Sequence, residues 1–468
     1  MKKTFLVLIF IVASLLLLSC GNVPDNYVEE SEFLGTVTEI TSETKEKNTK
    51  KATSPRPKPT QPALDNNDDI QGEGMKREYK AMNFENMKCM WLSQFDLSRV
   101  YCDGGTQRRE ADFRRYMSAI LDNVVLNGMN TVFLQVRPNA DSMYPSEVYP
   151  PSAYVVGEYG NNFSYDAVSI VVELAKEKNL SVHAWINPLR VMSDEKITMI
   201  PHNYTIRRWY DDIELRGKYL VKIGNNWYLN PAYADVRTLI LDGACELMQK
   251  YEFDGLHMDD YFYPTTDTSF DSYAYSQYLR SGGDLSLEDF RRDSLNKLIS
   301  AMYSIVKSVD DSALYGISPA GNYNTVYNAH YADIYTWCSS DGYIDYICPQ
   351  VYFGLEHSSF DFVNTSKIWQ GYIKSDSVKL VIGMSLGKAI SGSDNYAGAG
   401  KNEWSEHKDV LKRCLMNTQT LEKCIGVSYF CYQYFYDPIT GESNAATQEE
   451  RDNFIPLLKE CTWSGLIN

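Results

Sequence analysis

The feature of this 468-residue sequence that most constrains its fold is a repeated pair of segments, a short apolar one followed by a longer one with helical spacing. Eight apolar segments have the length and composition of buried strands. They are residues 88–95, 131–136, 181–187, 255–259, 314–319, 346–352, 380–385 and 426–432. The helical patterns are residues 112–127, 165–178, 235–250, 287–309, 360–374, 406–421 and 447–461, with a weaker one at 332–339. Regular alternation predicts a parallel sheet, and eight units predict closure into a (β/α)8 TIM barrel.

An open, doubly wound sheet is the competing fold, because it is built from the same units. Such sheets commonly carry a Gly-rich phosphate-binding turn after the first strand, and none follows residues 88–95. The glycines at Gly392, Gly398 and Gly400 follow no strand directly and indicate a loop at the rim. We therefore expect the barrel.

The first twenty residues have the pattern of an export signal. Lys2 and Lys3 precede an apolar run at residues 5–18, which is too short for a comfortable membrane span. The ending Leu17-Leu18-Ser19-Cys20 resembles the bacterial lipobox, in which the cysteine is lipidated. An ordinary signal peptide with a chance cysteine is the alternative. We expect an exported protein held by lipidated Cys20 at the outer face of the cytoplasmic membrane or at the cell surface.

Residues 21–84 are rich in Ser, Thr, Glu, Lys, Asn and Pro, so they predict a disordered tether. Residues 85–468 form one long block without a second linker, which suits a barrel with loop insertions. Two connections, 188–234 and 261–286, are longer than a barrel needs and are rich in Trp and Tyr. Aromatic side chains with polar tips suit sugar rings, although a core that needs large side chains also explains many of them.

The strand at 255–259 ends in two adjacent carboxylates, Asp259 and Asp260, at the end of the barrel where such enzymes place their chemistry. In phase with His257, Asp259 should face the barrel mouth. Neighbouring carboxylates push their pKa values apart, and a raised pKa suits a general acid. Glycoside cleavage uses one carboxyl as acid and another as nucleophile or base. Asp141 could equally supply the second carboxyl.

The other strand ends and the loops after them are also polar, and they supply the donors and acceptors that hydroxyl recognition requires. The predicted substrate-binding residues are Arg137, Asp141, Trp185, Asn187, Arg190, His257, Tyr261, Asn322, Gln350 and Tyr352. Structural roles remain open: Asn187 and Asn322 could make turns, and one of the two aspartates could be paired with Arg137 or Arg190.

Five motifs carry a resemblance over essentially the whole barrel. They are Gln135-Val136-Arg137-Pro138-x-x-Asp141-x-x-Tyr144, Trp185-x-Asn187-Pro188-x-Arg190, Leu229-Asn230-Pro231 with Asp235-Val236-Arg237, Asp254-Gly255-Leu256-His257-Met258-Asp259-Asp260-Tyr261-Phe262-Tyr263-Pro264, and Pro349-Gln350-Val351-Tyr352. Together they resemble the glycosyl-hydrolase-like family commonly labelled "family 10 glycosylhydrolase" lipoproteins. Met258 stands where Phe is more usual.

The resemblance implies a TIM barrel, an exported and often lipid-anchored form, and hydrolysis of cell-envelope glycans. Some members are regarded as cutting peptidoglycan strands stripped of their stem peptides. It carries over Asp259 and Asp260 as catalytic candidates. The residues it implies at the site are Arg137, Asp141, Asn187, Gln350 and Tyr352.

Two further function classes remain open. One is a catalytically silent, lipid-anchored glycan-binding barrel. The other is a metal-dependent polysaccharide deacetylase, for which His183, His257 and Asp259 could meet inside a barrel. The six histidines show no metal-binding spacing, so we expect no metal or other cofactor, and we expect His257 to orient a carboxylate.

Composition limits the classes of molecule that the protein can bind. A net charge of −16 argues against nucleic acid and fits neutral or N-acetylated sugars better than an acidic polymer. Nine cysteines follow Cys20 without a C-x-x-C motif, and nothing identifies a disulfide pair.

Overall fold

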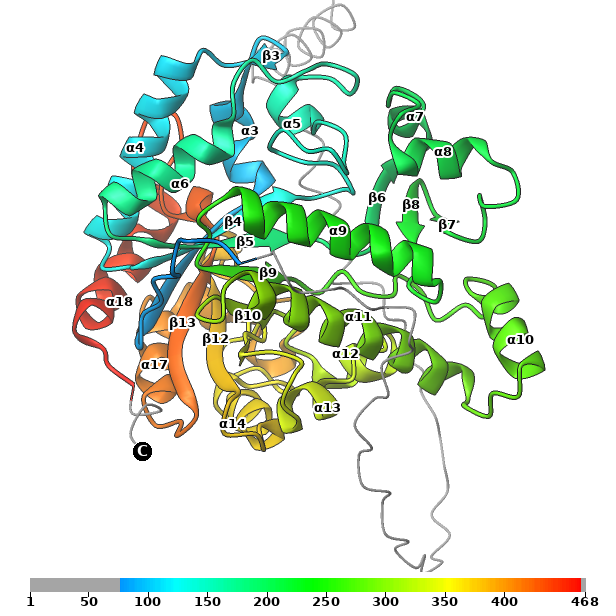
Figure 1. The fold of residues 1–468 in the computed structure, drawn as a ribbon. Helices are drawn as coiled ribbons and strands as arrows, with labels where there is room; N and C mark the ends of the chain where they lie inside the picture. The colour runs from blue at the N-terminus through cyan, green and yellow to red at the C-terminus, as the bar shows by residue number, and fades with distance from the viewer. Residues whose placement is uncertain (1–75, 464–468) are drawn as a thin grey trace, which may run out of the picture. The chain divides into compact units, whose positions relative to one another are not determined.

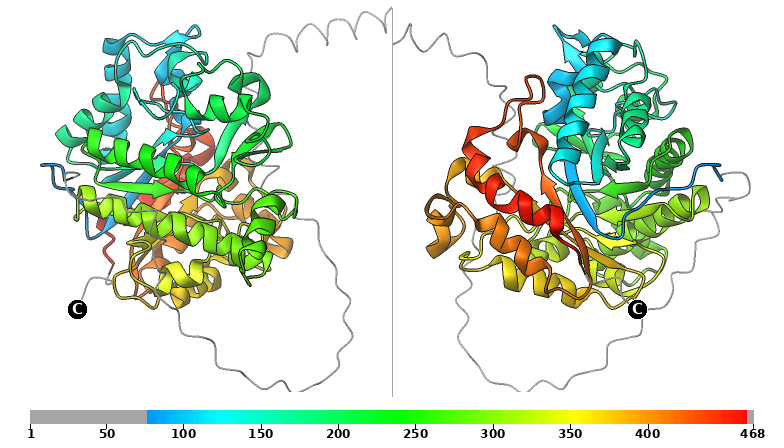
Figure 2. Two further views of the ribbon diagram at one scale, coloured as in Figure 1. Left: turned by 45° about the vertical axis from the view of Figure 1, so that its right-hand side comes forward. Right: turned by 90° about the vertical axis from the view of Figure 1, so that its left-hand side faces the viewer.

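Eight parallel strands close into a barrel in which neighbours in space are neighbours along the chain (Figure 1). They are β1 (Met87–Leu92), β4 (Thr131–Arg137), β5 (Ser181–Ile186), β9 (Gly255–Met258), β10 (Leu314–Ile317), β11 (Tyr346–Ile347), β12 (Lys379–Ser385) and β13 (Cys424–Phe430). β1 pairs with both β4 and β13, which closes the barrel, and Figure 2 shows the first strand beside the last. The computed structural model describes residues 76–463. The predicted barrel is confirmed, and the open sheet is not formed.

Helices surround the strands at the predicted places. They are α4 (Glu110–Leu126), α6 (Ala167–Glu177), α9 (Ala234–Lys250), α11 (Leu287–Val309), α13 (Ile334–Ser339), α14 (Phe362–Tyr372), α17 (Val410–Thr418) and α18 (Gln448–Glu460). Each presents one apolar face to the barrel; in α4 this face is Phe113, Met117, Leu121 and Val124, all fully buried. This burial is the reason that helical spacing in the sequence located the helices.

Shorter elements line the connections. They are α3 (Gln94–Tyr101), β2 (Cys102–Asp103), β3 (Thr106–Gln107), α5 (Ala153–Val156), α12 (Tyr323–Asn328), α15 (Gly387–Ser391), η1 (Gly398–Asn402), α16 (Glu403–Glu406), η2 (Tyr432–Tyr434) and η3 (Ala445–Thr447). Ser93 and Asp96 cap α3 reciprocally, so this helix begins immediately after β1.

The two long connections fold into structure of their own. The first contains β6 (Arg190–Ser193), α7 (Asp194–Ile197), α8 (Thr205–Asp211), β7 (Leu220–Ile223) and β8 (Asn226–Leu229), with an antiparallel sheet in the order β6-β8-β7. The second contains α10 (Ser272–Arg280). Trp209, Trp227 and Tyr228 are buried in the first insertion. These aromatic side chains therefore form a local core, and the aromatic content of this loop is largely structural.

A column of polar side chains runs through the apolar barrel interior. The His183 Nδ1 and His257 Nδ1 atoms lie 2.9 and 2.7 Å from the Tyr346 hydroxyl, and His183 Nε2 lies 2.9 Å from Asn83 Oδ1. Glycine at position 316 makes room for it, because a Cβ atom there would lie 2.0 Å from the Tyr346 ring. We call these four side chains the polar column.

Residues 77–83 lie against the end of the barrel at which β9 and β10 begin. Arg77 donates to Asp310 and to the carbonyl oxygens of Met248 and Tyr251, and the Tyr79 hydroxyl donates to Asp254 at 2.5 Å. The sequence placed this segment in the tether, because its composition is polar. Its polar groups instead satisfy buried acceptors, so the packed part of the chain includes it. Cys20 and residues 21–75 lie outside the described residues.

The cysteines of the barrel are thiols. All nine in residues 76–463 are free, and seven of the nine are buried, such as Cys89 and Cys348. Within the same residues, no helix combines the length and apolar character needed to cross a membrane.

Candidate active site

Asp259 follows β9 directly and points into a ring of hydrogen-bond donors. Its Oδ2 accepts from Trp185 Nε1 at 3.0 Å and from Asn187 Nδ2 at 2.5 Å, and its Oδ1 accepts from the Tyr261 backbone N–H at 3.3 Å. The carboxyl is 2% exposed. Strand β5 and the residue that follows it therefore supply two of the three donors, and the orientation toward the barrel mouth expected from the phase of His257 agrees with these contacts.

A relay of amides holds Asn187 in place across neighbouring strands. Gln135 Nε2 donates to Asn187 Oδ1 at 2.7 Å, and Gln135 Oε1 accepts from the Gln94 backbone N–H at 2.7 Å. The relay begins after β1, passes through β4 and the end of β5, and ends on Asp259 after β9. Because Asn187 Oδ1 is occupied by a donor, its Nδ2 must face Asp259, so the amide orientation is fixed.

Asp260 lies on the other side of the strand end and is half-buried. Its Oδ1 accepts from Gln350 Nε2 at 3.2 Å, and the same nitrogen donates to the Ser318 carbonyl at 3.1 Å. Gln350 follows β11 and Ser318 follows β10, so Asp260 leans toward the strands opposite to those that hold Asp259. The two adjacent aspartates thus face different halves of the rim.

Both carboxyls resist ionisation. Burial, and then the neighbouring charge of Asp260, raises the pKa of Asp259 well above its ordinary value, and the donors from Tyr261 and Trp185 oppose this only in part. Burial also raises the pKa of Asp260, against the opposing influence of His330 and Gln350. Because both pKa values are raised, the pair retains a proton to a higher pH than an isolated aspartate does.

Aromatic and cationic side chains complete the rim. The Arg190 guanidinium lies 5.0 Å from the centre of the Tyr261 ring, and its charge acts to lower the pKa of Asp259. Across the mouth, the Tyr352 ring stacks on Phe430 with centroids 6.0 Å apart, and both are half-buried. Partly exposed aromatic faces beside a carboxylate pair suit the apolar C–H face of a sugar ring.

Two predicted site residues, Arg137 and Asn322, have structural contacts instead. Arg137 is 3% exposed and binds the Tyr149 hydroxyl and the carbonyl oxygens of Asn187 and Pro188, so it supports the loop that carries Asn187. Asn322 caps α12 through its side-chain oxygen. Neither pairs with the aspartates, and Arg137 does not form the ion pair that the sequence left open.

Asp141 is fully buried in the loop after β4. Its Oδ1 accepts from the Asn139 backbone N–H at 2.9 Å, and its Oδ2 accepts from the Tyr159 hydroxyl at 2.7 Å. Burial raises the pKa of this carboxyl as well. These contacts hold the loop together and do not include either member of the Asp259–Asp260 pair.

His257 lies in the barrel interior below the pair, where its ring stacks on Phe133 at 4.1 Å. Its Nδ1 contacts Tyr346 and its Nε2 has no hydrogen-bond partner, so it does not bond a carboxylate as expected. Burial lowers its pKa, and the ring is neutral. In residues 76–463, no three His, Cys, Asp or Glu side chains are grouped so that they could hold a metal ion.

Sequence reasoning missed three members of the site. Gln94 and Gln135 support Asn187, and His330, which is half-buried, interacts electrostatically with Asp260. Gln135 belongs to the motif that begins Gln135-Val136-Arg137, but its contact with Asn187 depends on the pairing of β4 with β5, which the motif does not reveal. His330 lies in the connection between α12 and α13, where no motif surrounds it.

Comparisons with known proteins agree with this geometry. The model of a family described as Glycosyl hydrolase-like 10 matches residues 86–397. Glycosyl hydrolase YngK of Bacillus subtilis (strain 168) is 29% identical over 329 residues, which is 66% of this chain and 61% of YngK. Glycosyl hydrolase DigH of Escherichia coli O6:H1 (strain CFT073) is 29% identical over 383 residues, 76% of this chain and 85% of DigH.

Two solved structures share the fold at low sequence identity. The glycoside hydrolase domain of PgaB (BpsB) from Bordetella bronchiseptica has a TM-score of 0.50 and 13% identity, covering 79% of this chain and 99% of that domain. The catalytic domain of β-amylase from Paenibacillus polymyxa has a TM-score of 0.51 and 9% identity, covering 81% and 100%. These two likenesses show the barrel fold. The family model covers residues 86–397, which is more than half of the chain, so this chain belongs to the Glycosyl hydrolase-like 10 family.

Proposed function

We propose that the protein hydrolyses O-glycosidic bonds in extracellular or cell-envelope glycans, with Asp259 and Asp260 as its catalytic residues. The observation that supports this most directly is the pair itself: two adjacent carboxyls, both with raised pKa, at the carboxyl end of a barrel strand. The names of the relatives, glycosyl hydrolases YngK and DigH, support the same reaction class.

The contacts suggest different roles for the two carboxyls. Asp259 is almost inaccessible, and its three donors favour its charged form over its protonated form. When the proton of the pair is on Asp260, the Asp259 carboxylate can stabilise the positive charge developing on the sugar ring. Asp260 is half-buried and has one donor from a neighbouring side chain, Gln350, so it can reach a bound substrate. We assign the general acid to Asp260.

In the reaction, the Asp260 proton moves to the glycosidic oxygen as the bond from that oxygen to the anomeric carbon breaks. The bonding electrons stay with the leaving oxygen. A water oxygen then bonds to the anomeric carbon, and the proton it loses restores the protonated carboxyl. The role of the second carboxyl decides the configuration at the anomeric carbon. A carboxylate that attacks this carbon as a nucleophile gives retention, and one that activates the water as a base gives inversion.

The substrate we propose is the peptide-stripped glycan strand of peptidoglycan, a chain of N-acetylated sugars. The net charge of −16 argues against nucleic acid and other highly acidic polymers as the substrate. We also propose that the protein is exported and tethered through lipidated Cys20, which would keep it beside such strands.

The test is digestion of purified, peptide-free glycan strands by the full chain, with new reducing ends counted by mass spectrometry. We expect Asp260→Asn and Asp259→Asn each to abolish product formation. Asp267→Asn is the matched control, because it makes the same change at an exposed aspartate in the loop after the pair. Asp267→Asn should leave the rate unchanged. Strands that stay intact but sediment with the protein would overturn hydrolysis in favour of the glycan-binding barrel.

A further inference from the structure

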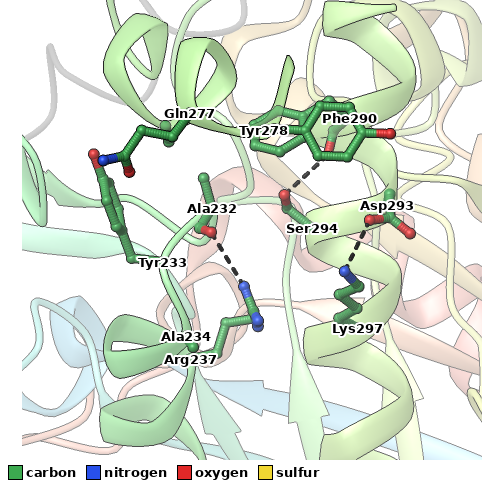
Figure 3. Close-up of a pocket in the computed structure, with 11 residues that line it drawn as sticks. Ala232, Tyr233, Ala234, Arg237, Gln277, Tyr278, Phe290, Asp293, Ser294 and Lys297 are labelled. Carbon is green, nitrogen blue, oxygen red and sulfur yellow. Dashed lines mark hydrogen bonds and ion pairs between the residues drawn. The ribbon is translucent and has the colours of Figure 1, made fainter. Parts of the chain in front are cut away.

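A pocket of about 260 Å³ lies between the start of α9, α10 and the first half of α11. The residues that line it come from all three helices (Figure 3); those used below are Tyr233, Arg237, Gln277, Tyr278, Asp293 and Lys297. None of these six residues belongs to the relay of hydrogen bonds that ends on Asp259. A volume slightly below the ~300–1,000 Å³ of drug-sized sites has room for one sugar ring. We call it the α10 pocket.

Aromatic rings form its walls and its margin. The Tyr278 ring packs against Phe290 with centroids 5.0 Å apart, and its hydroxyl accepts from the Asp284 backbone N–H at 3.2 Å. Tyr273, one helical turn before Gln277 on α10, is 48% exposed, and its hydroxyl accepts from Gln277 Nε2 at 3.0 Å. The Lys218 ammonium lies 4.7 Å from the centre of the Tyr273 ring, so a sugar can stack only on the part of this exposed ring that Lys218 leaves open.

The charged side chains of the α10 pocket are engaged by neighbouring groups of the protein. Lys297 and Asp293 form an ion pair at 3.2 Å, and Arg237 donates to the carbonyl oxygen of Pro231 at 2.9 Å. Figure 3 shows this ion pair on one side of the pocket and the Gln277 amide beside Tyr233 on the other. A ligand would therefore meet aromatic faces, an amide and hydroxyls, beside charged groups that the protein itself already engages. This chemistry suits an uncharged polyhydroxy ring better than a phosphate or a carboxylate.

The α10 pocket is rigidly connected to the loop that follows the catalytic pair. Arg291 on α11 is fully buried and binds Asp271, at the start of α10, through two hydrogen bonds of 2.8 and 2.7 Å. The same guanidinium lies 5.4 Å from the centre of the Tyr263 ring. Tyr263 stands three residues after Asp260, so a sugar in the pocket would have a fixed distance from the site of cleavage.

We propose that the α10 pocket is a second saccharide-binding site, which holds one uncharged or N-acetylated sugar unit of a polymeric glycan away from the catalytic pair. The choice of a glycan rests on the proposed function, whereas the preference for an uncharged ring rests on the pocket itself. The site increases the time that a long strand stays bound, because a strand held at two points dissociates more slowly than one held at one point.

The experiment measures binding without turnover, in the full chain that carries Asp260→Asn. Its migration is followed by affinity electrophoresis in gels containing glycol chitin, a soluble and uncharged polymer of N-acetylglucosamine, or carboxymethyl cellulose, an acidic polymer. We expect glycol chitin to retard the parent. Adding Tyr273→Ala with Gln277→Ala should weaken the retardation about five-fold to thirty-fold, the range for loss of a central aromatic contact.

Leu279→Ala is the matched control, because Leu279 is 45% exposed on the same helix and does not line the pocket. It should leave the retardation unchanged. Equal retardation of the parent and the double variant, no retardation of the parent by glycol chitin, or stronger retardation in the acidic polymer would each overturn the proposal. Failure of the catalytic proposal would appear separately, as a wild-type chain that releases no reducing ends.

Discussion

At the scale of single residues, burial of the ionised Asp259 carboxyl lowers the free energy of unfolding of the protein. Because its folded pKa is raised above the unfolded value of about 3.9, the folded state holds its proton more tightly, and stability is lost as the pH rises through the folded pKa. We expect Asp259→Asn to unfold at the same or a higher temperature than the wild type at pH 7, while activity falls about 10²-fold to 10⁴-fold. Thermal melts at pH 4 and pH 7 should show the advantage of the variant growing with pH.

A melting temperature that is lower for Asp259→Asn at both pH values would contradict this account. It would mean that the charged form is well stabilised by the donors from Trp185 and Asn187, and that burial does not dominate the titration.

Two asparagines predicted at the site make a matched pair. Asn187→Ala removes a donor to Asp259 and leaves Gln135 Nε2 without its acceptor, so we expect the rate on glycan strands to fall about 10²-fold through misplacement of the carboxyl. Asn322→Ala removes a helix cap and should lower the free energy of unfolding by about 1 kcal/mol with the rate nearly unchanged. Rate measurements with denaturant titrations of both variants test this. The reverse pattern would show that Asn322 binds substrate and Asn187 does not.

At the scale of secondary-structure elements, α17 and α18 meet at a buried carboxyl. Glu450 is 2% exposed, it accepts from the Leu411 backbone N–H, and burial raises its pKa to about 7. Between the unfolded value near 4.3 and about 7, rising pH removes stability, because the folded state must give up a proton that it holds more tightly. We expect Glu450→Gln to gain stability relative to the wild type between pH 5 and pH 8, by a few kcal/mol in order of magnitude.

Denaturant titrations at the two pH values provide the measurement. A difference between variant and wild type that does not change with pH would show that Glu450 is charged in the fold throughout this range.

The barrel strands could be predicted because parallel strands are buried on both faces, so each is a nearly continuous apolar run in the sequence. The small sheet β6-β8-β7 could not, because its strands mix buried with partly exposed residues and therefore lack a continuous apolar run. The carboxylate pair was found because it directly follows a strand. The support of the pair by Gln94 and Gln135 could not be predicted, because these side chains meet Asn187 only when neighbouring strands lie side by side in the barrel.

At the scale of the whole molecule, the segment 77–83 joins the chain before β1 to the end of the barrel away from the catalytic pair. Asp310 accepts from Arg77 and from the Ala81 backbone N–H, and its pKa is lowered to about 2 by these donors and by Ser312, against the effect of burial. A depressed carboxyl pKa stabilises the fold above the unfolded value of about 3.9, and this contribution is lost as the pH falls toward 2.

We therefore expect a chain that begins at residue 85 to be less stable than one that begins at residue 76. Arg77→Ala in the longer chain should cost about 3 kcal/mol, because it leaves the buried Asp310 charge with only the exposed Lys80 as an ion-pair partner. Denaturant titrations at pH 7 and pH 3 measure both effects, and the difference should shrink at the lower pH. Lys80→Ala is a control, since Lys80 is largely exposed and its ion pairs should contribute little.

Asn83 determines which atom donates and which accepts in every hydrogen bond of the polar column. Asn83 Nδ2 donates to the carbonyl oxygens of Asp254 and Ser312, so Asn83 Oδ1 can only accept, and His183 must carry its hydrogen on Nε2. The bare His183 Nδ1 then takes the Tyr346 hydrogen, and the Tyr346 oxygen takes one from His257 Nδ1. Each imidazole is thereby held in a single, different tautomer, and His257 presents a lone pair on Nε2 inside the barrel. An asparagine on the segment before the first strand thus determines the protonation pattern of a histidine two residues from the catalytic pair.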